Sequence, residues 1–127
     1  MYRWIVWAAF LMAAVLSAAD LAGTYKGSYN GSAGASGDFM ITLSQSGGQW
    51  NADVSFRLGD VVKAKTMSVE VDGAKVKVVY QFDFQDARLE SAATGELKGD
   101  KLEGTYETKV VADGSAVDQG QWSATRQ

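Results

Sequence analysis

The chain has 127 residues, and its 15 acidic side chains outnumber its 12 basic ones, which gives a formal net charge of −3. Nucleic acid is therefore not an expected partner, because phosphate binding needs clustered cations. The chain contains no histidine and no cysteine, which excludes serine–histidine and cysteine–histidine nucleophiles, typical zinc sites and disulfides. This composition argues against an enzyme and predicts neither a cofactor nor a bound metal.

The first nineteen residues have the pattern of an export signal. Arg3 supplies a positive charge, residues 4–16 form an apolar run, and Ser17-Ala18-Ala19 offers small side chains to a signal peptidase. The run up to Ala19 is shorter than the roughly 20 apolar residues that cross a bilayer. We therefore expect a signal peptide over 1–19, cleaved to leave eleven basic and fifteen acidic side chains. The protein would then be secreted or periplasmic without a stable membrane anchor, with an uncleaved anchor as the alternative.

After residue 20, short runs of residues alternate between apolar and polar, which is the period of half-buried strands. In chain order these runs cover residues 21–29, 39–43, 50–58, 62–71, 76–84, 89–97, 102–110 and 122–124. The alternation changes phase near Thr66, which predicts a β-bulge or bend there, with Val62 facing inward before it and Met67 after it. Turn residues, above all Asp72-Gly73, separate the runs, and no ten-residue amphipathic helix lies between them.

Eight strands in sequence order predict an all-β fold, a single antiparallel up-and-down β-barrel over residues 20–127. Closing such a meander into a barrel pairs the backbone groups of its two exposed edge strands. An open sandwich is the alternative. A barrel of this size either fills with its own side chains or holds one small ligand. The residues expected to face inward include both large aromatic side chains and small ones. A filled barrel and a barrel with a ligand cavity therefore both stay open. The candidate lining residues of a ligand cavity are Trp50, Phe56, Tyr80, Phe82 and Tyr106.

The two ends of the predicted barrel resemble those of the calycin barrels, the group that includes lipocalins and avidins. In lipocalins the first strand carries G-x-W, and an arginine from the last strand packs over that ring. Here Gly23 matches the glycine, Tyr25 stands at the tryptophan position, and Arg126 is the candidate partner. A guanidinium over a tyrosine ring contributes roughly 0.5–2 kcal/mol and would close the first strand onto the last. The resemblance implies a barrel that binds a small apolar ligand.

Two other segments carry groups that could serve a site. The glycine-rich run 31–37 lacks the Gly-Lys-Ser/Thr ending of a phosphate loop, so it is expected to be a flexible connection between the first two strands. The segment from Asp113 to Asp118 has only two carboxylates for a calcium ion, and a solvated turn is the expected structure.

A group of acidic residues, Asp83, Asp86 and Glu90, is the one candidate for acid–base chemistry. Alternation directs Asp83 to solvent, and Asp86 falls in a turn, so no catalytic residue is assigned. Two functions stay open. One is an exported carrier of a small hydrophobic ligand, motivated by the leader, the barrel pattern and the aromatic interior. The other is a protein-interaction module, such as a periplasmic inhibitor or accessory subunit, with a filled barrel and functional loops.

Overall fold

The computed structural model describes residues 21–127, and the signal peptide predicted over 1–19 lies outside the described residues. The described chain is an antiparallel β-barrel that is nearly closed, which confirms the predicted all-β class. Within this range no helix is long and apolar enough to span a bilayer. The strands are β1 (Gly23–Gly31), β2 (Ser36–Ser46), β3 (Gln49–Leu58), β4 (Asp60–Lys63), β5 (Lys65–Asp72), β6 (Lys75–Phe84), β7 (Ala87–Lys98), β8 (Lys101–Val110) and β9 (Ala116–Arg126).

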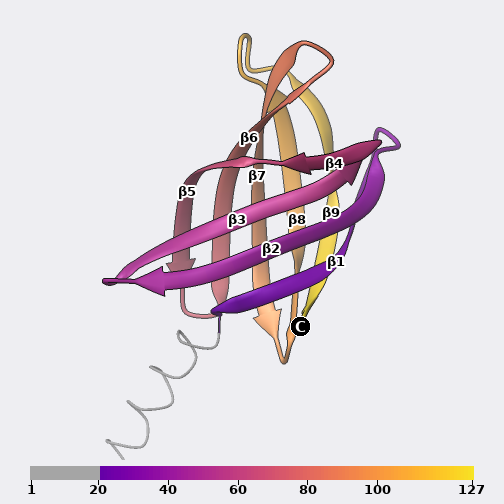
Figure 1. Ribbon diagram of the computed structural model, residues 1–127. Coiled ribbons are helices and arrows are strands. Elements are labelled where there is room, and N and C mark those ends of the chain that lie inside the picture. Colours follow the sequence, from indigo (N-terminus) through magenta and orange to yellow (C-terminus); the bar gives the residue numbers. More distant parts are fainter. Residues whose placement is uncertain (1–20) are drawn as a thin grey trace, which may run out of the picture.

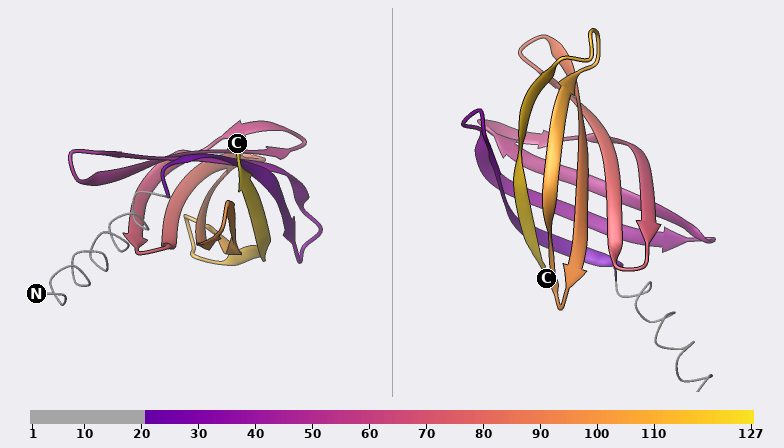
Figure 2. Two further views of the ribbon diagram at one scale, coloured as in Figure 1. Left: turned by 90° about the horizontal axis from the view of Figure 1, so that it is seen from below. Right: turned by 180° about the vertical axis from the view of Figure 1, so that it is seen from behind.

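One sheet contains all the described strands, in the order β4-β3-β2-β1-β9-β8-β7-β6-β5. Strands β1 and β9 are paired antiparallel, so the first and last strands join the two halves of the wall. Strands β1 to β3 run obliquely across the direction of β6 to β9 (Figure 1). Seen from below, β2 and β3 form a flat layer over the arched wall of the later strands (Figure 2).

The seam of the barrel lies where β5 passes β3. Here the Ala64 N–H donates to the Val54 carbonyl at 2.9 Å, and the Thr66 hydroxyl donates to the Ala52 carbonyl at 2.6 Å. These two bonds replace a continuous ladder, which is why the barrel is nearly rather than fully closed. Both edges of the sheet meet at this seam, and these two bonds join them.

The structure has nine strands where the sequence predicts eight, and the difference lies in residues 60–72. The predicted single run pairs with β3 as β4, breaks at Ala64, and pairs with β6 as β5. The register shifts between Thr66 and Ser68, which confirms the predicted bulge. Met67 is the extra residue of this bulge and is 47% exposed, so its predicted inward position is wrong. A bulged residue leaves the ladder and with it the alternation that assigns a face.

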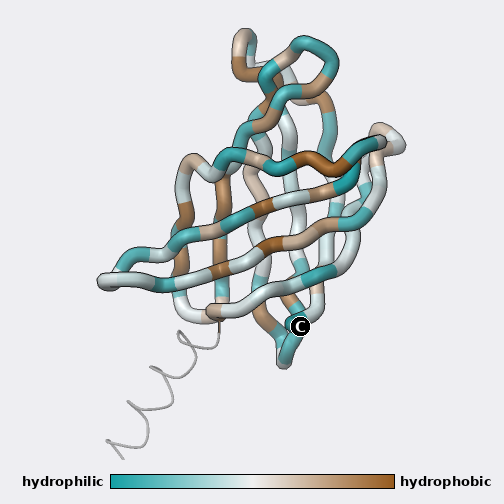
Figure 3. Tube along the Cα trace, in the orientation of Figure 1, coloured by the Kyte–Doolittle hydropathy of each residue, from teal (hydrophilic) through white to brown (hydrophobic). Residues whose placement is uncertain are grey.

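The lower end of the barrel, where β1 begins and β9 ends, is solidly packed. Hydrophobic and hydrophilic residues alternate along the strands (Figure 3), and the inward set forms one core. Among the side chains with almost no exposure, Leu21, Tyr25, Leu43 and Leu102 lie toward this end. Branched aliphatic side chains fill the space there, because they interdigitate at close to crystal density.

The residues predicted to close the barrel lie together at this packed end. The Arg126 guanidinium carbon is 5.2 Å from the centre of the Tyr25 ring, and its Nη2 donates to the Tyr25 hydroxyl at 2.9 Å. The same hydroxyl donates to the Leu21 carbonyl at 2.9 Å, while Arg126 Nη1 reaches the Ala22 carbonyl at 3.2 Å. A Cβ added at Gly23 would lie 3.8 Å from the Arg126 side chain, so Gly23 adjoins this contact. The contact ties the last strand to the segment that precedes the first.

Candidate functional site

The upper half of the barrel holds a cavity of about 360 Å³. Its lining includes Ala33 from the β1–β2 connection, Gln85 from the β6–β7 turn, and Val117 from the start of β9. These three segments lie at the upper end of the barrel. The cavity therefore opens at the end opposite the packed lower end. Small-molecule sites have volumes of roughly 300–1,000 Å³, and this cavity falls within that range.

Four of the five predicted lining residues lie on the cavity wall. They are Phe56 on β3, Tyr80 and Phe82 on β6, and Tyr106 on β8. Phe56 is at the centre of the group, with ring centroids 4.8 Å from Phe82 in an edge-to-face contact and 6.1 Å from Tyr80. Such edge contacts hold the rings in defined positions, and a ligand would therefore meet a preformed aromatic wall.

The fifth predicted lining residue, Trp50, is not part of the cavity wall. It is the second residue of β3, near the β2–β3 turn at the lower end of the barrel, where its half-buried ring packs against the core. Alternation along a strand shows which face a side chain occupies, but the height of that residue along the barrel depends on strand tilt and register.

Other aromatic residues on the wall come from β1, β2 and β9. Tyr29 lies edge-on to both Phe56 and Tyr106, at centroid distances of 5.9 and 6.0 Å, and its hydroxyl donates to the Arg57 carbonyl at 2.6 Å. Phe39 and Trp122 have their ring centroids 5.1 Å apart. The alternation of their strands identifies all three as inward-facing, but no pattern in the sequence shows that they share a cavity with β6 and β8.

Trp122 lies over a bare stretch of backbone. A Cβ added at Gly95 would lie 2.6 Å from the indole ring, so only glycine leaves room for it there. The indole N–H is 3.2 Å from both the Thr94 and the Thr105 carbonyl oxygens. The ring is therefore held in one orientation at the base of the cavity.

Hydroxyl groups form a small polar area within the apolar wall. The Ser91 and Thr108 hydroxyls are 2.6 Å apart, and both residues are buried. Burial raises the pKa of Tyr80 to about 12, although its hydrogen bond with Ser91 acts in the opposite direction. These side chains stay neutral near neutral pH and offer a ligand hydrogen-bonding groups without charge.

This buried tyrosine predicts a loss of stability in alkaline solution. In the unfolded chain a tyrosine ionises near pH 10, whereas Tyr80 in the fold keeps its proton to about pH 12. Between these values the folded state binds more protons, so the free energy of unfolding falls by about 1.4 kcal/mol per pH unit. Tyr80→Phe should make this fall shallower between about pH 10 and about pH 12 in urea titrations. An unchanged slope in the variant would contradict the assignment.

Asp118 brings a carboxylate to the mouth of the cavity, which corrects the expectation of a solvated turn. Its Oδ2 accepts from the Tyr106 hydroxyl at 2.7 Å, and its Oδ1 accepts from the Ala33 N–H at 3.2 Å. The carboxylate lies so close to Gly31 that a side chain added there would have to displace it. Asp113, in contrast, stays in the turn, where its Oδ1 accepts bonds from the backbone and hydroxyl of Ser115.

Regular alternation along β9 directs Asp118 inward, and a bulge next to it brings Val117 to the cavity as well. The register shifts opposite Thr108 and Lys109, so Val117 is an extra residue, and it lines the cavity together with Asp118. Two consecutive side chains would face opposite sides of a regular strand. Counting back in steps of two from Trp122 places Asp118 on the inner face, and this is the signal in the sequence that could have identified it.

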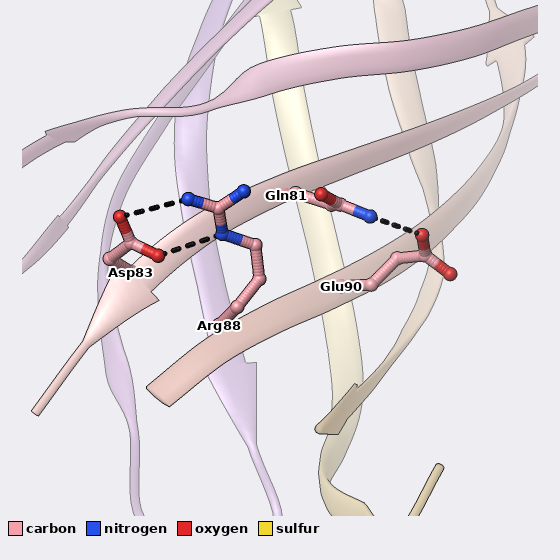
Figure 4. A network of polar contacts seen from close by, with 4 residues as sticks. All are labelled: Gln81, Asp83, Arg88 and Glu90. Carbon is pink, nitrogen blue, oxygen red and sulfur yellow. Dashed lines mark hydrogen bonds and ion pairs between the residues drawn. The ribbon is translucent and has the colours of Figure 1, made fainter. Parts of the chain in front are cut away.

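The acidic group considered for catalysis lies outside the cavity. Arg88 donates to both oxygens of Asp83, at 2.9 and 3.3 Å, and Gln81 donates to Glu90 at 2.9 Å across the β6–β7 ladder (Figure 4). The bonds from Arg88 lower the pKa of Asp83. Asp86 lies in the β6–β7 turn as predicted, with φ of 66°. The pairs are cross-strand surface contacts, and they do not converge on a shared reaction centre.

The glycine-rich run is a short connection flanked by the ends of two strands. Strand β1 extends through Gly31 and β2 begins at Ser36, so the connection has only four residues. Within it the Gly31 N–H donates to the Ala35 carbonyl at 2.7 Å, and the Ser32 N–H bonds to the Gln119 carbonyl at 2.8 Å. The connection forms one side of the cavity mouth.

Chemically, the site offers an apolar aromatic wall, a few neutral hydroxyls and one carboxylate at the opening. Over residues 21–127, no three acidic side chains come together as they would to hold a metal ion. Comparison with models of protein families found none that matches this chain, and comparison with curated proteins found no match either.

Proposed function

We propose that this protein is an exported carrier that holds a small apolar ligand inside its barrel. The observation that carries the proposal is the cavity of about 360 Å³, which is walled by aromatic rings and opens at one end. Removing apolar surface from water would drive binding, and the edge-to-face rings need no rearrangement to accept a ligand. The export signal formed by Arg3 and the apolar run after it supports a secreted or periplasmic location.

The resemblance to calycin barrels supports the same proposal. Arg126 packs over Tyr25 at the closed end, which is the contact that the lipocalin pattern implies. The alternative, an interaction module with a filled barrel, has less support because the interior contains a cavity of ligand size.

Tryptophan fluorescence can test for a ligand in the cavity. The chain has four tryptophans, and replacing Trp4, Trp7 and Trp50 by phenylalanine leaves Trp122 on the cavity wall as the single emitter. Titration with decanol and other small apolar molecules should give a saturable change in Trp122 emission, with a dissociation constant on the order of micromolar.

The matched control keeps Trp50 and replaces the other three tryptophans. Trp50 lies outside the cavity wall, so its emission should not respond to the same ligands. Absence of a saturable response from Trp122 across the whole panel would overturn the carrier proposal. An equal response from both tryptophans would place binding elsewhere on the protein.

A further inference from the structure

Charge is distributed unevenly around the cavity. Of the described residues that line it, Asp118 is the single charged one, and no lysine or arginine contributes to the wall. The rest of the lining is apolar or neutral. An ionised ligand entering the cavity would therefore meet one fixed charge, and that charge is negative.

The carboxylate of Asp118 is held in place by the protein, but some of its hydrogen-bond acceptor positions are still free. Tyr106 and the Ala33 N–H each donate one hydrogen bond to it, and contact with Gly31 limits its movement. A carboxylate has about four positions at which it can accept hydrogen bonds. Two of these are used by the protein, so the group can still accept from a ligand in the cavity.

The tyrosine beside this carboxylate cannot neutralise it. Burial and the hydrogen bond to Asp118 both raise the pKa of Tyr106, so its hydroxyl stays protonated and acts as a donor. The charge of Asp118 is therefore stabilised by a neutral partner, and no cation cancels it.

Charges farther out at the open end have the same bias. The basic residues at the upper ends of β3, β7 and β8 each lie within 4 Å of a carboxylate, in the pairs Arg57–Asp38, Arg88–Asp83 and Lys109–Glu107. The connections at this end add Asp60, Asp86 and Asp113, which form no ion pair within the described residues. Unpaired carboxylates around an apolar opening attract cations and repel anions.

We propose that the cavity selects apolar molecules that carry a cationic head group, with the head against Asp118 and the apolar part against the aromatic rings. This inference rests on the proposed carrier function and specifies its ligand class. A fatty carboxylate is disfavoured, because its charge would face Asp118 with no basic side chain on the wall to compensate. A primary ammonium can donate directly to the free acceptor positions of the carboxylate.

Three ligands with the same ten-carbon chain provide the test. Decylammonium, decanol and decanoate are titrated, below their micelle concentrations, against the full chain that carries Trp122 as its single tryptophan. We expect decylammonium to bind about tenfold more tightly than decanoate, with decanol between them, and the difference to shrink as salt is added. This comparison needs no change at Asp118, so it holds even if variants there fold poorly.

Substitution then assigns the preference to one residue. Asp118→Asn should weaken decylammonium binding by about tenfold while decanol binding changes by less than about twofold. Asp53→Asn is the matched control, because it removes the same charge from the exposed outer face of β3. It should leave the order of the three ligands unchanged.

The outcomes separate the two proposals. If all three ligands bind with equal affinity, or if Asp118→Asn leaves the preference intact, the charge inference is overturned and the carrier proposal stands. A preference for decanoate would also overturn it. If none of the three gives a saturable response, both the inference and the carrier function are overturned.

Discussion

Replacing Trp122 by alanine is expected to lower the free energy of unfolding by about 3–5 kcal/mol. The residue is 4% exposed, its ring packs on Phe39, and its indole N–H bonds to two backbone carbonyls. Its removal would enlarge the cavity downward over Gly95 and leave both carbonyls without this donor. Total stabilities of small domains are only about 5–15 kcal/mol, so the variant should be close to unfolding.

Trp50→Ala is the matched control for this prediction. The same atoms are removed, but the Trp50 ring is only half-buried and lies outside the cavity wall. We expect its effect to be less than half that of Trp122→Ala. Urea unfolding followed by circular dichroism measures the free energy of unfolding of both variants. Equal decreases would show that the packing of Trp122 inside the barrel contributes no more to stability than the half-buried Trp50 ring.

Filling the mouth of the cavity should abolish ligand binding. Ala87 lines the cavity at the start of β7, opposite Phe84 in the β6–β7 ladder. Ala87→Trp would place an indole ring in the opening, and we expect binding of decanol and decylammonium to weaken by more than about tenfold. Isothermal titration calorimetry is the suitable measurement, because the added tryptophan would complicate fluorescence.

Ala112→Trp provides the comparison for this variant. Ala112 is exposed in the β8–β9 connection at the same end of the barrel, but it does not line the cavity. Binding to this variant should match the unchanged protein. If Ala87→Trp binds equally well while remaining folded, the ligand does not enter through this opening.

Much of the fold could be predicted from local patterns. The alternation over residues 76–84 and the Asp72-Gly73 turn before it predict β6 and its hairpin with β5, because period and turn chemistry are local properties. The structure pairs these strands with Asp72 opposite Lys75. The phase change near Thr66 likewise identified the bulge. What failed there was the assignment of Met67, because an inserted residue follows neither of the two phases.

The candidate site was predicted only in part. Phe56, Tyr80, Phe82 and Tyr106 follow from alternation, whereas Trp50 was misplaced because face alone does not give height in the barrel. Asp118 was interpreted as part of a turn, although alternation counted back from Trp122 places it on the inner face of β9.

The amino-acid sequence by itself determined the all-β class, the approximate strands and the face that most side chains occupy, because each depends on neighbours a few residues apart. Only the tertiary structure decided that the barrel is hollow at one end, and that Asp118 stands at its mouth. The space left inside depends on how rings from β1, β3, β6, β8 and β9 fit together. That fit is set by tilt, register and bulges between strands far apart in the chain.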